Sequence, residues 1–187
     1  PADLDLGEEL WTPIGLGYEH SFRGTFDGGF HYITGVKVDL PALIEPGEGS
    51  TAGFFDVVQG GVVENLYVIG SMRAFSVAGL VHTLCDGAVL RNCVFNGSTR
   101  WTWIDGSHYG STSALVCLNQ DSLVANCCVT EDYAVSGDFN AGLVGTNYGE
   151  GKTKNCYISI DLGIMPNYEI GTVEHCFSLT HDLTSET

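Results

Sequence analysis

The chain has 187 residues, of which 44% are hydrophobic, so it is long enough and apolar enough to bury a core. Seven Lys and Arg face 23 Asp and Glu, which gives a formal net charge of −16. Such a surface repels phosphate backbones and anionic membranes, and no apolar stretch approaches the roughly 20 residues that span a bilayer. The composition therefore excludes a disordered tail and disfavours nucleic-acid binding and membrane insertion. The acidity is consistent with solubility, a calcium site or a cationic partner.

The first predicted elements are short strands in residues 3–38. This segment contains DLDL at Asp3–Leu6, WTPIG at Trp11–Gly15 and FRGTFDGGFHYITGVKV at Phe22–Val38. Apolar residues alternate there between glycines, a pattern typical of strands separated by tight turns. Residues 41–50 contain two prolines and end in GEGS, so a polar loop is expected to follow the strands.

From Thr51 onward a phrase recurs, consisting of a small apolar run, a gap and then Asn, usually followed by Cys. The runs are Ala52–Phe55, Ala78–Val81, Ser113–Val116 and Ala141–Val144. The Asn follows the second residue of each run after 12 or 13 positions, as in Gly53/Asn65, Gly79/Asn92, Ala114/Asn126 and Gly142/Asn155. A nearly constant inner spacing of this kind indicates a repeat architecture.

The steps between whole repeats predict the fold. Equivalent positions lie 20 to 34 residues apart at Gly35, Asn65, Asn92, Asn126, Asn155 and His175. Three short strands with turns fit such a step, whereas a propeller blade needs about 40–50 residues. We expect an all-β, right-handed parallel β-helix (β-solenoid) of about five to six coils. It would form one domain, residues 1–187, with a leader coil in 1–50 and repeats in 51–187. Because the chain opens on Pro1, we expect it to be part of a longer protein.

The Asn-Cys pair has a structural interpretation. Asn tolerates the left-handed conformation of a corner, and its amide can bond to the equivalent amide of the next coil. We therefore expect a ladder of Asn65, Asn92, Asn126 and Asn155. The next residue faces inward, which predicts a buried row of Cys93, Cys127, Cys156 and Cys176. Disulfides between coils are the alternative, while the absence of a CxxC pair argues against a metal site.

The apolar runs and Asn-Cys phrases resemble the GLUG repeat of bacterial surface and secreted proteins. The opening strands, with WTPIG and FRGTFDGGFHYI, resemble the leader usual in those proteins, and the match spans about residues 3 to 180. Asp56, His82 and Cys117 replace the last glycine of the run, which only Gly145 keeps. The resemblance implies a parallel β-helix at the cell surface or outside the cell. Some such proteins are adhesins, and in large immunoglobulin A peptidases the repeat is an accessory module.

No motif of a known catalytic chemistry occurs in the chain. It lacks His-Glu-x-x-His and Gly-x-Ser-x-Gly, and it has no phosphate-binding glycine loop. Cys85 or Cys117 could pair with a histidine in space, but no local signature supports this. Asp27 lies in a TFDGG turn, where an Asp usually caps its own backbone. We therefore expect neither a catalytic residue nor a cofactor.

The stretch Gly97–Ser113 interrupts the repeat and is the candidate binding site. It causes the longest step and concentrates aromatic, basic and acidic side chains, namely Arg100, Trp101, Trp103, Asp105, His108 and Tyr109. Such a mixture on a loop of a rigid scaffold suits recognition of a protein or a carbohydrate. The alternative is that Trp101 and Trp103, which lie on one face of a strand, pack against the fold.

The sequence thus predicts a non-enzymatic repeat module, outside or on the surface of a bacterium, that acts in adhesion by binding a host protein or a glycan. The alternative is a carbohydrate-active β-helix, either a polysaccharide hydrolase or a lyase. It would use Asp27 or Asp56 beside Asp86, Asp121 and Glu150. That alternative requires at least two carboxylates to converge at roughly 5–10 Å on one open face.

Overall fold

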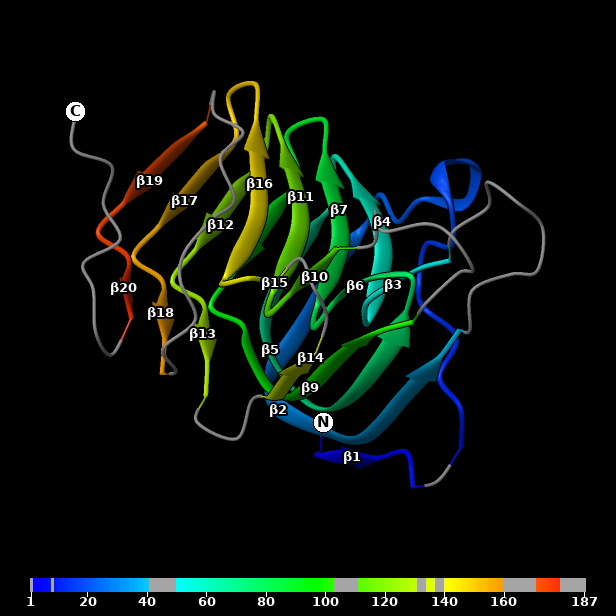
Figure 1. The fold of residues 1–187 in the computed structure, drawn as a ribbon. Helices are drawn as coiled ribbons and strands as arrows, with labels where there is room; N and C mark the ends of the chain where they lie inside the picture. Colours follow the sequence, from blue (N-terminus) through cyan, green and yellow to red (C-terminus); the bar gives the residue numbers. More distant parts are fainter. Residues whose placement is uncertain are drawn as a thin grey trace.

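In a computed structural model of the chain, the backbone is all-β and its strands pair in parallel (Figure 1). The structure describes residues 2–7, 9–40, 50–102, 111–130, 134–136, 140–159 and 171–178. Within these ranges there is no α-helix, and the 3₁₀ turn η1 (Tyr18–His20) is the one helical segment. The prediction of an all-β chain with parallel sheets is therefore confirmed.

The strands form three sheets. The first four-stranded sheet contains β3 (Thr51–Ala52), β6 (Ser76–Ala78), β10 (Thr112–Ser113) and β15 (Asn140–Ala141). The second contains β4 (Phe55–Gln59), β7 (Val81–Cys85), β11 (Val116–Gln120) and β16 (Val144–Tyr148). The third is twelve-stranded and contains β1 (Leu4–Asp5), β2 (Thr25–Asp39), β5 (Val62–Ala74), β8 (Val89–Arg91), β9 (Val94–Trp101), β12 (Leu123–Ala125), β13 (Cys128–Val129), β14 (Ala134–Ser136), β17 (Lys152–Lys154), β18 (Tyr157–Ile158), β19 (Thr172–Glu174) and β20 (Phe177–Ser178).

Each repeat supplies the three sheets in the same order, so equivalent residues of successive repeats face one another. Val81 lies opposite Phe55 on one side and Val116 on the other, and Val116 lies opposite Val144. The constant spacing within the repeat follows from this register, since every repeat crosses the same two sheets before it reaches its Asn. The twelve-stranded sheet curls around the two smaller ones (Figure 1).

The leader pairs in a register that differs from the predicted one. β2 runs beside β5, with His31 opposite Leu66, so leader residues 28–30 face the single residue Asn65. The leader position that corresponds to the Asn is therefore in this bulge, where Phe30 has a φ of 61°, and not at Gly35. Gly35 belongs to a second irregularity, between Ile33 and Val36. Each bulge adds residues to one strand only, which shifts a count made from the sequence.

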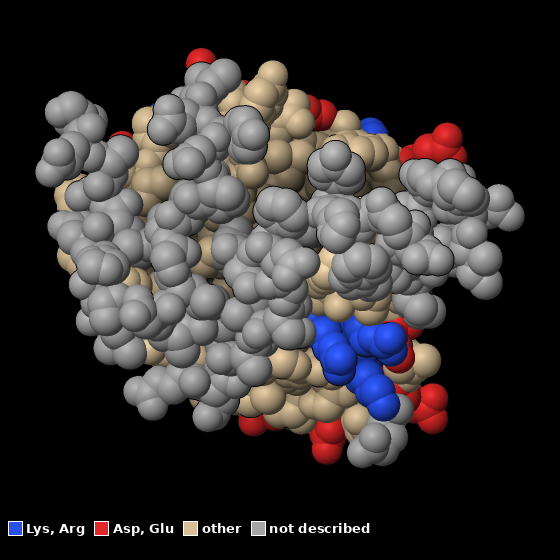
Figure 2. Space-filling model, in the orientation of Figure 1, with Lys and Arg blue, Asp and Glu red and all other residues tan. Residues whose placement is uncertain are grey.

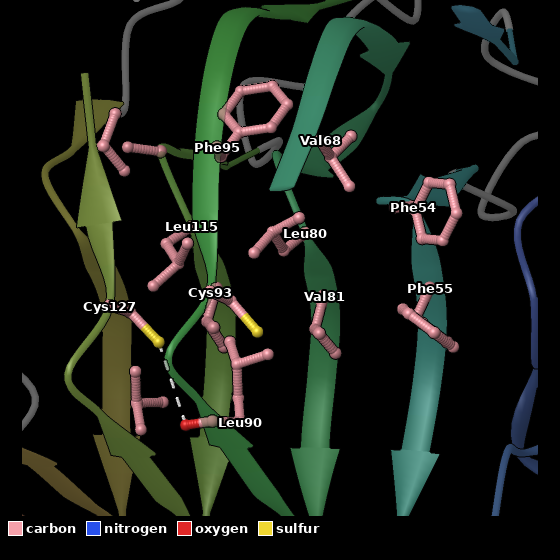
Figure 3. Packing of buried hydrophobic residues seen from close by; sticks show 14 of the residues in the cluster. Phe54, Phe55, Val68, Leu80, Val81, Leu90, Cys93, Phe95, Leu115 and Cys127 are labelled. Carbon is pink, nitrogen blue, oxygen red and sulfur yellow. Dashed lines mark hydrogen bonds between the residues drawn. The ribbon is translucent and has the colours of Figure 1, made fainter. Parts of the chain in front are cut away.

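The core fills the space enclosed by the sheets. Its largest fully buried side chains include Phe54, Phe55, Leu80, Leu90 and Phe95 (Figure 3). The leader closes the first edge, because Ile14 and Phe22 form parallel bridges to Phe55 and Val58 of β4. Trp11 stacks on Phe54 with ring centroids 4.8 Å apart. Ring stacking and backbone bridges together cover an edge that would otherwise be open to another strand.

Candidate functional site

The four Asn positions form one continuous hydrogen-bonded row at the outer corner of the twelve-stranded sheet. Each side-chain amide donates to the side-chain oxygen of the preceding Asn, at 3.0 Å from Asn92 to Asn65, 3.2 Å from Asn126 to Asn92 and 3.2 Å from Asn155 to Asn126. Their φ angles lie between 52° and 55°, in the left-handed region. His175, at the equivalent position of the last repeat, has a similar φ of 50°. The strand equivalent to β5 breaks at this corner in later repeats, so that β8 is followed by β9 and β12 by β13.

Asp27 lies at the start of the row. Its Oδ1 accepts a hydrogen bond from the Asn65 amide at 3.0 Å and another from the Gly29 backbone N–H at 2.9 Å. These two donors lower the pKa of the Asp27 carboxyl below its ordinary value. The carboxylate thus caps its own turn and anchors the Asn row, and this role accounts for its presence in the TFDGG segment.

The four predicted ladder cysteines are buried in the core, each exposing about 1% of its surface or less. Each thiol donates to the carbonyl two residues before it, at 3.1 Å for Cys93, 3.2 Å for Cys127, 3.2 Å for Cys156 and 3.4 Å for Cys176. The Cys127 thiol also lies 3.8 Å from the carbonyl oxygen of Leu90 on the neighbouring strand (Figure 3). Burial raises the pKa of Cys127, which keeps the thiol protonated, and all seven cysteines are free.

The predicted binding stretch is only partly within the described residues. Arg100 is exposed and lies in β9, opposite Arg73 of β5. Trp101 is only 9% exposed and lies opposite the fully buried Ala74, so its ring packs inward and is not available to a partner. This burial fits the packing alternative at Trp101. Trp103, Asp105, His108 and Tyr109 lie outside the described residues, and their role stays a prediction.

A groove of about 620 Å³ runs across the outer face of the twelve-stranded sheet. Its aromatic side chains are Tyr32, Tyr67 and Tyr157, each two positions after the bulge or the Asn corner. Strand pairing lines up Tyr32, Tyr67, Val94, Cys128, Tyr157 and Phe177 on successive strands. Adjacent strands are about 4.8 Å apart, so Tyr67 and Tyr157, three strands apart, are separated by roughly 14 Å.

The tyrosines combine exposed ring surface with fixed positions. Tyr32 and Tyr157 expose 46% and 39% of their surfaces. Tyr67 is half-buried, with its ring 5.1 Å from that of Tyr32 and 6.4 Å from that of Phe30. Contacts of this kind limit the rotamers of a ring before any ligand arrives, which reduces the entropy lost on binding.

The rest of the described lining is neutral. Asn96, Thr130 and Ser159 form a second row, each two residues further along its strand. Asn96 offers an amide to the groove, whereas the hydroxyl oxygens of Thr130 and Ser159 are buried. Cys128 lies between the aromatic ends, and burial raises the pKa of its thiol. Among the described residues that line the groove, none is acidic or basic. The site can therefore stack on and hydrogen-bond to a ligand, but these residues supply no general acid or base.

The carboxylates proposed for the enzymatic alternative are distributed over three places. Asp27 anchors the Asn row, and Asp56 is buried on β4 with 1% of its surface exposed. Asp86, Asp121 and Glu150 follow equivalent ends of β7, β11 and β16. There Asp86 accepts from the Gln59 amide at 2.6 Å, and Asp121 accepts from the Glu150 backbone N–H at 2.7 Å. These bonds stabilise the turns at that edge.

A second polar constellation replaces the missing glycines of the apolar runs. Asp56, His82 and Cys117 follow equivalent residues of β4, β7 and β11. The His82 Nδ1 lies 3.9 Å from Asp56 Oδ1, and its Nε2 lies 2.9 Å from Ser76 Oγ. Ser76 Oγ continues to Ser111 Oγ at 2.8 Å, and Ser111 donates to Cys117 Sγ at 3.8 Å. Burial lowers the pKa of His82 and raises that of Cys117.

This buried network satisfies its own polar groups. The Asp56 carboxylate accepts from the Gly17 backbone N–H at 2.8 Å and from Thr51 Oγ1 at 2.7 Å. The Cys117 thiol donates to the Val77 carbonyl at 3.1 Å. A nucleophile requires a thiolate or an adjacent base with access to substrate, whereas burial holds this thiol protonated. We interpret the network as a structural link between the two smaller sheets.

No protein-family model matches the chain, and the searches of curated proteins and of solved structures found no match either. The described residues contain no helix long and apolar enough to cross a membrane. The fold and the groove therefore carry the functional argument alone. The groove tyrosines were not identified from the sequence, although a signal was present. In a strand, side chains two residues apart point to the same face, so the second residue after each outward Asn is expected to point outward as well.

Proposed function

We propose that the chain is a non-enzymatic repeat module of a bacterial surface or secreted protein and that it binds an extended glycan in the tyrosine-lined groove. The proposal includes a right-handed parallel β-helix of the GLUG-repeat kind. Parallel pairing of equivalent strands from successive repeats supports that architecture. The sequence order of leader and repeats supports the family resemblance. In such a module the repeats provide the rigid scaffold, and the outward side chains provide recognition.

The observation that carries the binding proposal is the set of exposed tyrosines on strands held in fixed register. A pyranose ring presents apolar C–H faces to an aromatic ring and hydroxyl groups at its rim. Tyr32, Tyr67 and Tyr157 supply rings and phenolic hydroxyl groups, and Asn96 supplies an amide beside them. The spacing of roughly 14 Å between Tyr67 and Tyr157 gives the groove the length of a short oligosaccharide, not of a single sugar.

The neutrality of the described lining favours binding over cleavage. Glycoside hydrolysis needs two carboxyl groups about 5 to 10 Å apart, and lyases need a base. The described lining residues contain no carboxylate. The Asp3 carboxylate beside the groove accepts from the Tyr32 backbone N–H at 3.0 Å and lies 3.2 Å from the His31 ring, and Asp27 accepts from Asn65 and Gly29. We therefore propose adhesion or carbohydrate capture as the activity, without turnover of the ligand.

A glycan array with the purified chain tests this proposal. We expect oligosaccharides to bind, and we expect Tyr67→Ala or Tyr157→Ala to weaken binding about fivefold or more, because stacking on each ring is worth about 1 kcal/mol or more. Tyr148→Ala is the matched control, since Tyr148 is exposed at the end of β16 and does not line the groove. Unfolding curves of the three variants would separate loss of binding from loss of stability.

Labelling of Cys128 gives an independent measurement of groove occupancy. Of the seven thiols, Cys128 is the one that is not buried, and it lies on the groove. A bound oligosaccharide should slow its reaction with a thiol reagent, while the same sugar should not protect Cys128 in Tyr67→Ala. Binding that survives both tyrosine substitutions and leaves Cys128 unprotected would place the ligand elsewhere. Capture of a protein without any glycan would contradict the choice of ligand.

A further inference from the structure

A basic cluster stands on the outer face of the twelve-stranded sheet of this strongly acidic chain. Three of its seven cationic side chains, Lys37, Arg73 and Arg100, come from adjacent strands β2, β5 and β9. Arg73 lies directly opposite Arg100, and Lys37 lies opposite Ser71, two residues before Arg73. Figure 2 shows the positive charge gathered over the ends of these strands, with acidic side chains directly beside it.

Within the described residues, one of these three cations forms an ion pair. Arg73 Nη1 forms an ion pair with Asp39 at 3.1 Å. In the part of the chain that the structure describes, Lys37 and Arg100 form no ion pair. Like charges directly opposite on neighbouring strands destabilise a sheet, so the Arg73–Arg100 pair opposes folding. A bound anion would reverse that effect, because it would place negative charge between two guanidinium groups.

The basic cluster and the groove share one face of the same strands. On β5 the outward residues run in the order Tyr67, Ile69, Ser71 and Arg73, since the even-numbered side chains between Leu66 and Ala74 point inward. On β9 the matching order is Val94, Asn96, Ser98 and Arg100. From Ile69 at the groove to Arg73 is four residues, or roughly 13 Å along the strand. Ser71 and Ser98, paired with each other, bridge this distance with hydroxyl groups.

We infer that the groove takes an acidic oligosaccharide, whose carboxylate or sulfate groups are bound by Lys37, Arg73 and Arg100. This inference rests on the proposed glycan-binding function and names its ligand class. The net charge of −16 does not prevent such binding. At physiological ionic strength the Debye length is about 8 Å, so the distant carboxylates are screened while the local cations still act.

Matched pairs of oligosaccharides that differ only in their acidic groups test this inference. Suitable probes are galacturonate hexamers with their methyl esters, and galactan hexamers with and without sulfate esters. We expect at least one acidic member to bind about tenfold more tightly than its neutral partner at about 0.15 M salt, and this preference to disappear at about 1 M salt. In Lys37→Gln/Arg100→Gln the acidic and neutral members should bind equally. Arg23→Gln, an exposed cation elsewhere, is the matched control and should keep the preference.

The possible failures of the two proposals are distinguishable. If acidic and neutral members bind equally to the unmodified chain and both are lost in Tyr67→Ala, the charge inference is wrong and the glycan-binding groove stands. An acid preference that persists in Lys37→Gln/Arg100→Gln would also overturn the inference, because the cations would then not be responsible. If no member of any pair binds, both proposals fail. Binding of the acidic member alone, lost both in the tyrosine variant and in the double variant, supports both.

Discussion

At the scale of single residues, asparagine at the repeat corner combines two properties. It adopts a φ near 53°, which costs most side chains about 1 kcal/mol or more, and its amide both donates and accepts. Glycine would supply the first property alone, and glutamine the second. The choice of Asn followed by Cys is thereby explained, because the thiol donates to the carbonyl that precedes the left-handed residue. Alanine at the Cys position would not donate to this carbonyl, and serine would fill less of the core volume than cysteine does.

Substitution of Asn126, in the middle of the row, should separate these two properties. Asn126→Gly keeps the left-handed conformation and loses two side-chain hydrogen bonds, which should cost about 1 kcal/mol. Asn126→Ala loses the conformation as well and should cost about 2 kcal/mol or more. Urea unfolding measures both values. Equal stability of the alanine variant and the unmodified chain would show that the row contributes nothing.

His82 should make stability depend on pH. Burial lowers its pKa in the folded state, with a partial opposing effect of Asp56. The folded chain therefore binds this proton less readily than the unfolded chain, so the contribution is fully present above the unfolded pKa of about 6.5 and is lost as pH falls below it. His82→Gln should remove the difference in unfolding free energy between mildly acidic and neutral pH. An unchanged pH dependence in that variant would assign the effect to other groups.

Residue types at the corner were predictable because they recur, and their roles follow from conformation alone. The outward tyrosines do not recur at every repeat, since Val94 and Cys128 take their place in two of them. The groove forms because the short side chains of Val94 and Cys128 lie between the longer tyrosine side chains. The depth between Tyr67 and Tyr157 thus depends on neighbours that come together only in the folded sheet.

At the scale of elements, a glycine pair lets β5 and β9 approach each other closely beyond the corner. Gly70 of β5 and Gly97 of β9 lie opposite each other. A Cβ on Gly97 would overlap the carbonyl oxygen of Gly70, and one on Gly70 would overlap that of Val36. Close approach of three backbones here lets the sheet bend between the groove and the basic cluster.

Gly97→Ala should therefore be strongly destabilising. The added Cβ cannot fit unless β9 moves away from β5, and its φ of 151° is also unfavourable for alanine, so we expect a cost of at least about 2 kcal/mol. Gly24→Ala is the matched control, because its Cβ would meet only the Phe22 ring at 3.4 Å. Chemical denaturation of both variants gives the comparison. A change at Gly97 as small as that at Gly24 would mean that the strands separate easily.

Strand identity was predictable from alternation and glycine boundaries, whereas the leader register was not. Bulges in β2 place three residues opposite Asn65, and nothing in the local sequence fixes how many residues a bulge contains. The predicted insertion was likewise divided by the fold. Its first part, up to Trp101, extends β9 and pairs with β5, because long-range pairing overrides the local break in the repeat.

At the scale of the whole molecule, the parallel pairing brings together residues that are distant in sequence. The net negative charge of the chain opposes this compact state. A formal charge of −16 on 187 residues produces self-repulsion that is weakly screened at low salt. Raising the salt from about 0.01 M to about 0.15 M shortens the Debye length from about 30 Å to about 8 Å. We therefore expect the thermal midpoint to rise over this range, as calorimetry can measure. A lower midpoint at the higher concentration would indicate that attractive ion pairs dominate.

The Asn row has a direction, and its two ends differ as a consequence. Every amide donates toward the N-terminal side, and the last donor meets the Asp27 carboxylate, which accepts hydrogen bonds and, when ionised, has none to give. An amide placed before Asp27 would receive no proton from it, so the row cannot be extended past this residue. At the opposite side each amide oxygen is an acceptor for the repeat that follows. Asp27 thus acts as a terminator, and the row can grow by added repeats in one direction only.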